Sequence, residues 1–192
     1  MSAKIRSVAG GKQAAGKADR HILCQGKYIN LLLENGWEFV ERRCISGIVA
    51  IVAVTDDNRL VLVEQLRRPV GRRVLELPAG LVGDKPGHRR EALATAARRE
   101  LLEETGYRSR RLRWLLQCPS APAISTAMID FYLATGLARV HAGGGDETED
   151  IRVHLAPLAG FDAWLRRQLR RGVLLDPKVH LGLSLAVRRM RG

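Results

Sequence analysis

The sequence predicts a mixed α/β fold in which a largely buried β-sheet packs against helices. Residues 47–54, GIVAIVAV, predict the sheet, because unbroken apolar runs of this kind are buried on both faces. Turn residues at 56–58 separate this run from a second apolar run. Residues 91–107 predict the main helix, because they are rich in Ala, Leu, Glu and Arg, contain no proline, and place Gly106 where a C-terminal cap would lie.

The chain divides into three parts by its residue pattern. Residues 1–20 are basic and lack an apolar segment, so we expect a flexible leader that is not a secretory signal. Residues 21–46 predict a β-hairpin, because two strand-like runs flank Asn35-Gly36, a strong two-residue turn signal. Residues 47–192 form the main domain, since no internal repeat or linker demands another division.

Further patterns order the elements of the main domain. Strands are expected at 59–66, 74–77, 111–118, 128–137 and 151–158. A loop at 81–90 leads into the main helix, and a glycine-rich acidic loop, HAGGGDETED, occupies 141–150. Two more helices are expected near the C-terminus, at 161–172 and 178–190.

The predicted main helix carries carboxylates on its apolar face. At about 100° per residue, the apolar residues form one stripe, comprising Leu93, Ala96, Ala97 and Leu101. Glu100 and Glu104 fall in the middle of that stripe, and Glu103 lies at its edge. Carboxylates one turn apart repel, and burial raises the cost. A divalent cation would remove the repulsion, and oxygen ligands suit Mg²⁺ or Mn²⁺. A solvated charged helix is the alternative.

Composition limits the partners. The formal net charge of +12 is compatible with nucleic acid, but its Arg pairs are spread along the chain, which is more typical of solvated faces. We therefore expect no nucleic-acid partner, and no apolar run is long enough to predict a membrane partner. Three scattered cysteines without metal-ligand spacing indicate a reduced, cytoplasmic setting.

Residues 91–107 resemble the Nudix box. The family pattern is a glycine, five residues, Glu, seven residues, then Arg-Glu-apolar-any-Glu-Glu-any-Gly-apolar. Every position from Glu91 onward matches, including RELLEETGY at 99–107. The front differs, because ten residues separate Gly80 from Glu91. We interpret this difference as a loop that is lengthened by five residues.

Within that superfamily the chain is similar to the ADP-ribose pyrophosphatase branch. Three features carry the likeness: the lead-in EQLRRPVGRRVLELPAG, Pro122 at fifteen residues past Tyr107, and ETEDIRVHLAPL at 147–158. The resemblance implies a mixed sheet packed between helices, with the N-terminal hairpin as an extension. It also implies aromatic residues that sandwich the base, often across a dimer interface.

The helix face and the resemblance together predict a magnesium site. The expected metal ligands are Glu100, Glu104, Glu103, which is shared between metals and also catalytic, and the backbone carbonyl of Ala79. Structural roles in the motif are expected for Gly80, Glu91, Arg99 and Gly106. Glu91 would begin the helix, where a negative charge favours the dipole, and Arg99 would pair with Glu91 or with Glu103.

The other predicted site residues lie outside the helix. Glu147 is the first choice for the general base and Glu149 the second, with a solvated acidic loop as the alternative. The resemblance implies substrate contacts by two aromatic residues on the base and two arginines on the base or diphosphate, with two further contacts; in order these are Tyr28, Trp37, Arg42, Arg67, Leu81 and Pro122. Trp37 could instead pack within the hairpin, and Arg67 could be an ordinary charge at a strand end.

The predicted function is Mg²⁺-dependent hydrolysis of ADP-ribose or a related nucleoside diphosphate sugar, which yields AMP and ribose 5-phosphate. One alternative is a Nudix hydrolase of another nucleotide, such as GDP-mannose, a dinucleoside polyphosphate or a nucleoside triphosphate. The other is a non-catalytic module that binds a nucleotide or RNA. We expect a homodimer, because the edge of the hairpin and its apolar run INLLL need cover.

Overall fold

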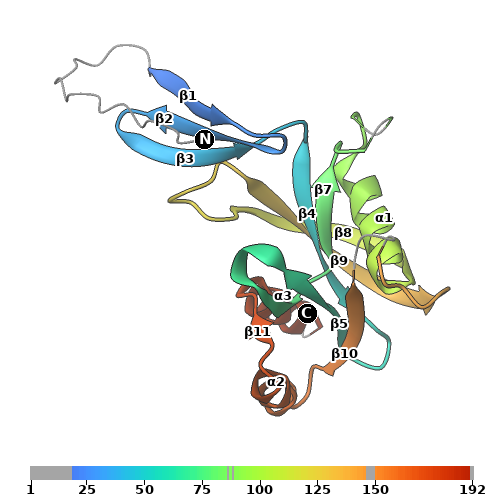
Figure 1. Cartoon of the computed structure of the whole chain (residues 1–192). Coiled ribbons are helices and arrows are strands. Elements are labelled where there is room, and N and C mark those ends of the chain that lie inside the picture. Colours follow the sequence, from blue (N-terminus) through green and yellow to red (C-terminus); the bar gives the residue numbers. More distant parts are fainter. Residues whose placement is uncertain (1–18, 86, 88, 146–149, 191–192) are drawn as a thin grey trace.

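The computed structural model describes residues 19–85, 87, 89–145 and 150–190, and it confirms the α/β fold. Within these residues, three helices lie against an eight-stranded mixed sheet, and a separate three-stranded sheet precedes it (Figure 1). The N-terminal sheet consists of β1 (Arg20–Gln25), β2 (Ile29–Glu34) and β3 (Trp37–Arg42). The main sheet consists of β4 (Gly47–Val54), β5 (Arg59–Arg67), β6 (Arg72–Glu76), β7 (Ala79–Val82), β8 (Tyr107–Pro119), β9 (Met128–Arg139), β10 (Ile151–Pro157) and β11 (Leu174–Leu175). The helices are α1 (Leu93–Thr105), α2 (Phe161–Arg170) and α3 (Lys178–Met190), and a short 3₁₀ turn, η1, covers Arg68–Val70.

The predicted N-terminal hairpin is formed by β2 and β3. Asn35 and Gly36 connect the two strands with φ values of 52° and 83°, a left-handed conformation that suits these residue types. The structure adds a third strand that the sequence pattern did not predict. This strand, β1, pairs antiparallel with β2 through a bulge between Ile22 and Cys24, and it begins at the last residue of the predicted leader, Arg20.

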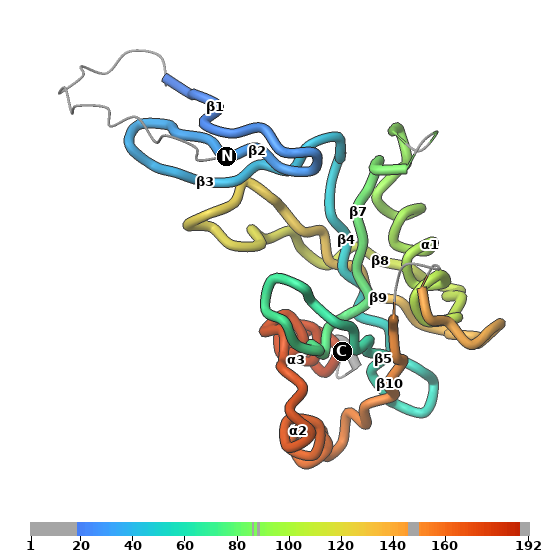
Figure 2. Tube along the Cα trace, in the orientation of Figure 1, coloured from blue at the N-terminus to red at the C-terminus, as the bar shows by residue number. Residues whose placement is uncertain are grey.

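The loop between β8 and β9 joins the N-terminal sheet to the main body. Val40 N–H donates to the Ile124 carbonyl (2.8 Å), and Thr126 N–H donates to the Val40 carbonyl (3.1 Å). Figure 2 shows this loop, in yellow, beside β3. The contact holds the ends of β2 and β3 close to the main sheet, so that Ile29 and Arg42 take part in the cavity described below.

The main sheet is mixed because β4 pairs parallel with β9 and antiparallel with β5 and β7. Alternate residues of β4 point to opposite faces. One face forms a core with α1: Val49, Ile51, Ala53, Ala96, Ala97 and Leu101. The other face forms a core with α2 and α3: Ala50, Val52, Val54, Phe161, Trp164 and Val179. The sheet therefore lies between helices, as predicted, and both faces of β4 are dry.

The main helix begins two residues later than predicted, at Leu93, because Ala92 is extended with φ −71° and ψ 143°. Glu91 therefore precedes the helix, and the expectation that it begins α1 is wrong. The C-terminal end agrees with the prediction. Gly106 has a φ of 74° and its N–H donates to the Leu102 carbonyl (2.8 Å).

The described part of the acidic loop caps the end of α1. Gly144 N–H donates to the Glu104 carbonyl (2.9 Å), and Gly145 N–H donates to the Glu103 carbonyl (3.1 Å). These bonds satisfy helix carbonyls that have no partner within the helix. The described part of the loop therefore lies beside Glu103 and Glu104, two of the residues expected to bind metal.

None of the helices in the described part of the chain combines the length and the apolar content that crossing a bilayer requires.

We expect Gly106→Ala to destabilise the protein more than Gly71→Ala. Both glycines have a positive φ, so each alanine carries a backbone cost of about 1–2 kcal/mol. A Cβ at position 106 would also lie 2.1 Å from the backbone oxygen of His141, whereas a Cβ at position 71 meets nothing within 4 Å. Urea unfolding of the two variants measures the difference, and equal losses of stability would contradict the packing of the loop on α1.

Candidate active site

The three helix carboxylates lie where the sequence placed them, on or beside the face that packs on the sheet. The Glu104 residue is only 3% exposed, and the side chains of Glu100 and Glu103 are 12% and 39% exposed. Two carboxylates are therefore withdrawn from water and the third lies at the border. Such a grouping requires compensating contacts, because a buried charge is costly unless it is paired.

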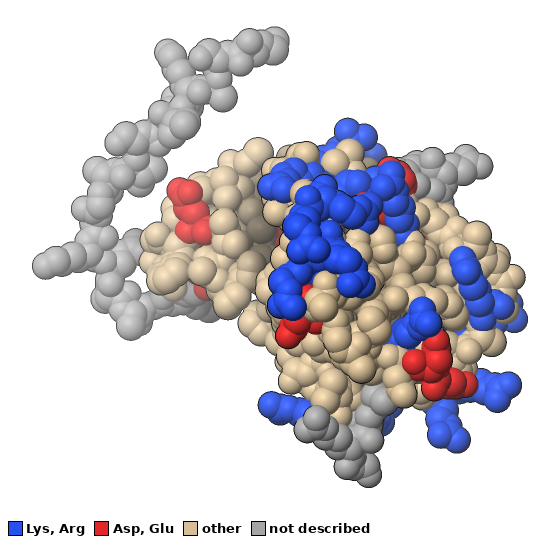
Figure 3. Space-filling model, turned by 90° about the horizontal axis from the view of Figure 1, so that it is seen from below, with Lys and Arg blue, Asp and Glu red and all other residues tan. Residues whose placement is uncertain are grey.

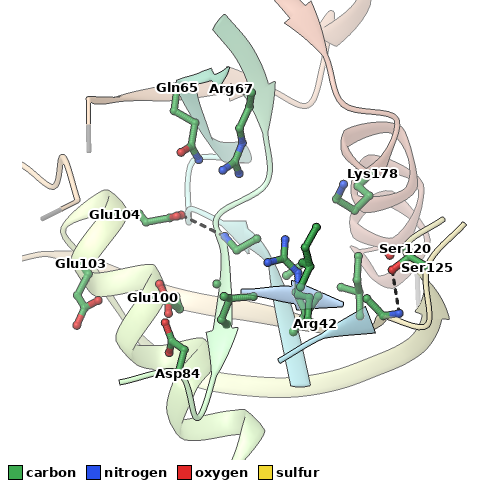
Figure 4. Close-up of a pocket in the computed structure, with 18 of the residues that line it drawn as sticks. Arg42, Gln65, Arg67, Asp84, Glu100, Glu103, Glu104, Ser120, Ser125 and Lys178 are labelled. Atoms are coloured by element: carbon green, nitrogen blue, oxygen red, sulfur yellow. Dashed lines mark hydrogen bonds between the residues drawn. The ribbon is translucent and has the colours of Figure 1, made fainter. Parts of the chain in front are cut away.

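The first two residues of β7 provide the first of these contacts. Ala79 N–H donates to Glu104 Oε2 (3.1 Å), the bond drawn in Figure 4. Gly80 lies directly against Glu100, since a Cβ built on Gly80 would be 2.0 Å from Glu100 Cδ. Only glycine leaves room for this carboxylate. Burial raises the pKa of Glu100 above its ordinary value, although the neighbouring Arg99 opposes the shift.

Arg99 links the carboxylates to the loop before the helix. Its Nε and Nη2 donate to Glu91 Oε1 and Oε2 (3.1 and 3.0 Å), and its Nη1 donates to Glu100 (2.7 Å) and Glu103 (3.2 Å). Its Nη2 also reaches the Leu81 carbonyl (3.3 Å). The hydrogen bonds to Glu91 are the largest cause of the raised pKa of Arg99. Arg99 thus pairs with both predicted partners, Glu91 and Glu103.

The lengthened loop contributes a second cation that the sequence reading missed. Lys85 Nζ lies 2.9 Å from Glu103 Oε2, and this hydrogen bond raises the pKa of Lys85. Asp84 beside it also faces the same cavity. Nothing in the spacing of the motif marked either residue, because the family pattern fixes no residue type between its glycine and its first Glu.

These groups open into a cavity of about 680 Å³ between α1, β7 and the N-terminal sheet. It brings together most of the predicted metal and phosphate residues: Arg42, Arg67, Ala79, Gly80, Leu81, Glu100, Glu103 and Glu104. Figure 4 shows the carboxylates of α1 along one side and three cations, Arg42, Arg67 and Lys178, on the other. The cavity therefore has a negative wall that faces a positive one.

The cations of the positive wall differ in availability. Arg67 donates from Nε and Nη2 to Glu76 (2.5–3.0 Å), and Gln65 donates to the same carboxylate (3.2 Å). Lys178 pairs with Asp176. Among the described residues, Arg42 makes no ion pair, so it is the cavity cation best able to meet an anion. The ion pair between Arg67 and Glu76 joins two neighbouring strands, so only the structure reveals it.

Three predicted substrate residues lie outside this cavity. Trp37 and Pro122 line a separate hollow of about 410 Å³, together with Phe39. Tyr28 is 67% exposed, with Lys27 over its ring at 4.9 Å. Within one chain, the aromatic residues and the carboxylates are thus in different places. Both predicted bases, Glu147 and Glu149, lie outside the described residues.

The donor set fits a hard divalent cation. Carboxylate oxygens and a backbone carbonyl are the ligands that Mg²⁺ and Mn²⁺ prefer. In the described part of the chain, no three Asp, Glu, His or Cys side chains are already grouped tightly enough to hold an ion. The side chains of Glu100 and Glu103 are instead held by Arg99 and Lys85. Glu100, Glu103, Glu104 and Ala79 remain the residues that would hold the metal.

Comparison with known proteins identifies the class. The NUDIX domain family model matches residues 46–171, and the chain therefore belongs to the Nudix family. It is a Nudix hydrolase by family, and the matched residues include all of α1.

Particular relatives carry different names. The chain is 38% identical to a methanol dehydrogenase activator of Bacillus methanolicus over 54% of each chain. It is 44% identical to an ADP-ribose pyrophosphatase of Mycobacterium tuberculosis over 49% of this chain and 44% of that protein. A GDP-mannose pyrophosphatase of Citrobacter koseri is 27% identical over 87% of this chain and 88% of its own length. The chain spans about half the length of the first two relatives.

A solved structure described as an ADP compounds hydrolase matches 94% of this chain and 98% of its own, with a TM-score of 0.68 and 23% identity. At this identity the match supports the fold alone.

We expect Gly80→Ala to damage the metal site while the fold persists. The φ of Gly80 is not positive, so alanine is tolerated by the backbone, but its Cβ would displace the Glu100 carboxylate. The free energy of unfolding should fall by about 1–3 kcal/mol, as at other overpacked positions, so that the protein stays folded, whereas Mn²⁺ affinity should fall. Calorimetric titration with Mn²⁺ and urea unfolding measure the two effects.

A double variant tests the route of this effect. If Gly80→Ala acts through Glu100, adding it to Glu100→Gln should weaken Mn²⁺ binding no further. Additive losses would show that Gly80 acts through another group.

Proposed function

We propose that the protein is a Mg²⁺-dependent hydrolase of nucleoside diphosphate sugars, with ADP-ribose as the first candidate substrate. The observation that carries this proposal is the single cavity that the helix carboxylates share with Arg42 and Arg67. Its volume of about 680 Å³ lies within the range of small-molecule sites. The relatives named ADP-ribose pyrophosphatase support the choice of substrate.

Each group of site residues has its own proposed role in diphosphate cleavage. Glu100, Glu103, Glu104 and the Ala79 carbonyl would hold the metal, and Arg42 would bind a phosphate oxygen. The bound metal supplies neutralisation of the diphosphate and a water of lowered pKa. Glu147 or Glu149 would accept the proton of that water. Support for this last role comes from the flanks of the loop: Gly145 is bonded to α1, and Asp150 accepts from Arg73 Nη1 (2.5 Å).

Base binding is proposed for the N-terminal sheet of a second copy of the chain. Trp37 is 66% exposed and borders a hollow with Pro122, and Tyr28 also faces solvent. Exposed aromatic rings suit stacking on a nucleobase, but neither ring reaches the carboxylate cavity of its own chain. A homodimer would provide cover for these rings and for Ile22 and Ile29 on the same sheet.

Other nucleotides remain the first alternative, and the likeness to a GDP-mannose pyrophosphatase supports it. The cavity walls recognise a diphosphate, which all of these substrates share. The discrimination among bases and sugars therefore depends on groups that contact neither phosphate nor metal.

The surface charge supports a second alternative, an RNA-binding module. Figure 3 shows Lys and Arg gathered in a band on the face that carries α2. The exposed arginines of α2 are Arg166, Arg167 and Arg170, and Arg171 follows the helix. Arg72 of β6 lies beside this end of α2, since its Nη2 donates to the Gly172 carbonyl (2.6 Å). The fold thus concentrates arginine pairs that the sequence separates. Steep weakening of RNA binding with rising salt, without hydrolysis of any nucleotide, would favour this function.

The primary test is product identification after incubation with ADP-ribose and Mg²⁺. We expect AMP and ribose 5-phosphate, and turnover should fall at least about 100-fold in Glu104→Gln, because even outer partners of metal ligands contribute 10- to 100-fold. Gln retains an oxygen that can accept from Ala79 N–H, so folding should persist. The control, Asp162→Asn on the exposed face of α2, also exchanges a carboxylate for an amide and should behave as wild type.

Two results would contradict this proposal. One is full activity in Glu104→Gln. The other is the absence of turnover on a panel of nucleoside diphosphate sugars by folded protein with Mg²⁺ present.

Sedimentation at micromolar concentration tests the dimer. We expect a mass of two 21.3 kDa chains. Trp37→Glu places a charge on the exposed N-terminal sheet and should shift the mass toward one chain. A monomeric wild-type protein would contradict the dimer and the proposed sharing of the base site.

A further inference from the structure

Lys85 forms an ion pair with Glu103, one of the carboxylates that are proposed to bind metal. It lies on the loop between β7 and α1, and its Nζ lies 2.9 Å from Glu103 Oε2. Both side chains line the large cavity, and both are about two-fifths exposed, at 40% and 39%. The ammonium group thus lies directly against a carboxylate that is proposed to bind a cation.

Arg99 also pairs with these carboxylates, but it is more buried than Lys85 and makes more hydrogen bonds. Its side chain is 13% exposed, and it bonds to Glu91, Glu100, Glu103 and the Leu81 carbonyl at once. Moving Arg99 away would break all of these hydrogen bonds. Glu91 and Glu100 would remain withdrawn from water and would lose the cation that pairs with both of them. Arg99 is therefore a fixed part of the site.

Lys85 has none of these constraints. Its ammonium group donates to Glu103, and its flexible four-carbon stem allows that group to leave without disturbing the backbone. Within the described residues, two cations therefore offset part of the negative charge on the carboxylate face of α1: Arg99 is fixed and Lys85 is exchangeable.

We propose that Lys85 is an internal counter-ion that competes with the divalent metal for Glu103 and thereby sets the affinity of the site for metal. The inference rests on the metal site of the proposed function. In the metal-free protein the ammonium group offsets the repulsion among the carboxylates of α1. When metal binds, Lys85 must give up Glu103, and its positive charge then opposes the metal at short range.

The expected effect is modest and has a definite sign. Ion pairs with this degree of exposure correspond to a factor of about two to five in an equilibrium constant. Removing the ammonium group should therefore tighten metal binding by about two- to fivefold. A lysine that merely supported the loop would leave affinity unchanged on removal, or would weaken it by releasing Glu103 from its position.

The experiment measures Mn²⁺ binding in the absence of substrate, by the loss of the free-ion paramagnetic resonance signal. Lys85→Met removes the charge and retains most of the stem, and we expect it to bind Mn²⁺ about two- to fivefold more tightly than wild type. Lys85→Arg retains the charge and should stay close to wild type. Lys27→Met removes an exposed lysine beside Tyr28, outside the cavity, and serves as the matched control.

The outcomes separate this inference from the proposed function. If wild type binds Mn²⁺ and Lys85→Met binds it equally or more weakly, the counter-ion role is overturned and the metal site stands. If wild type binds no Mn²⁺, both are overturned. Thermal unfolding of each variant with chelator present verifies that the folds compared are the same.

Discussion

The site depends on the contact between α1 and the first two residues of β7. Glu104 accepts a hydrogen bond from the backbone of Ala79, and Glu100 is pressed against the bare Cα of Gly80. Because Ala97 and Leu101 anchor the same helix in the core, the carboxylates cannot rotate out to water without loss of that packing. The hydrophobic core thus holds the negative charges in place. Arg99 lowers the free-energy cost of burying them, because it pairs with Glu100 and Glu103.

The two ends of α1 connect this contact to the rest of the molecule. Before the helix, Glu91 lies outside the first turn and binds Arg99 through both oxygens, which ties the lengthened loop to the carboxylate face. After the helix, Gly106 turns the chain, and Gly144 and Gly145 bond to the last carbonyls. One helix therefore organises the proposed metal ligands, the loop that precedes them and the described start of the acidic loop.

Charge separation across the cavity follows from which strand ends meet there. The carboxylates belong to α1, whereas Arg42 comes from the end of β3 and Arg67 from the end of β5. The N-terminal sheet is thus part of the site because it provides one wall. The proposed substrate has a negative centre and neutral ends, which suits this arrangement because a bound metal and Arg42 would both act on the centre.

The sequence by itself determined the family, the buried central strand, the hairpin at Asn35-Gly36 and the face of α1 that carries the glutamates, because each depends on local periodicity or on a motif of fixed spacing. Only the tertiary structure decided that Glu91 precedes the helix and that Trp37 and Pro122 share a hollow away from the carboxylates. It also decided two ion pairs, Arg67 with Glu76 and Lys85 with Glu103. These are contacts between residues brought together by strand pairing and loop path, which leave no periodic trace in the chain.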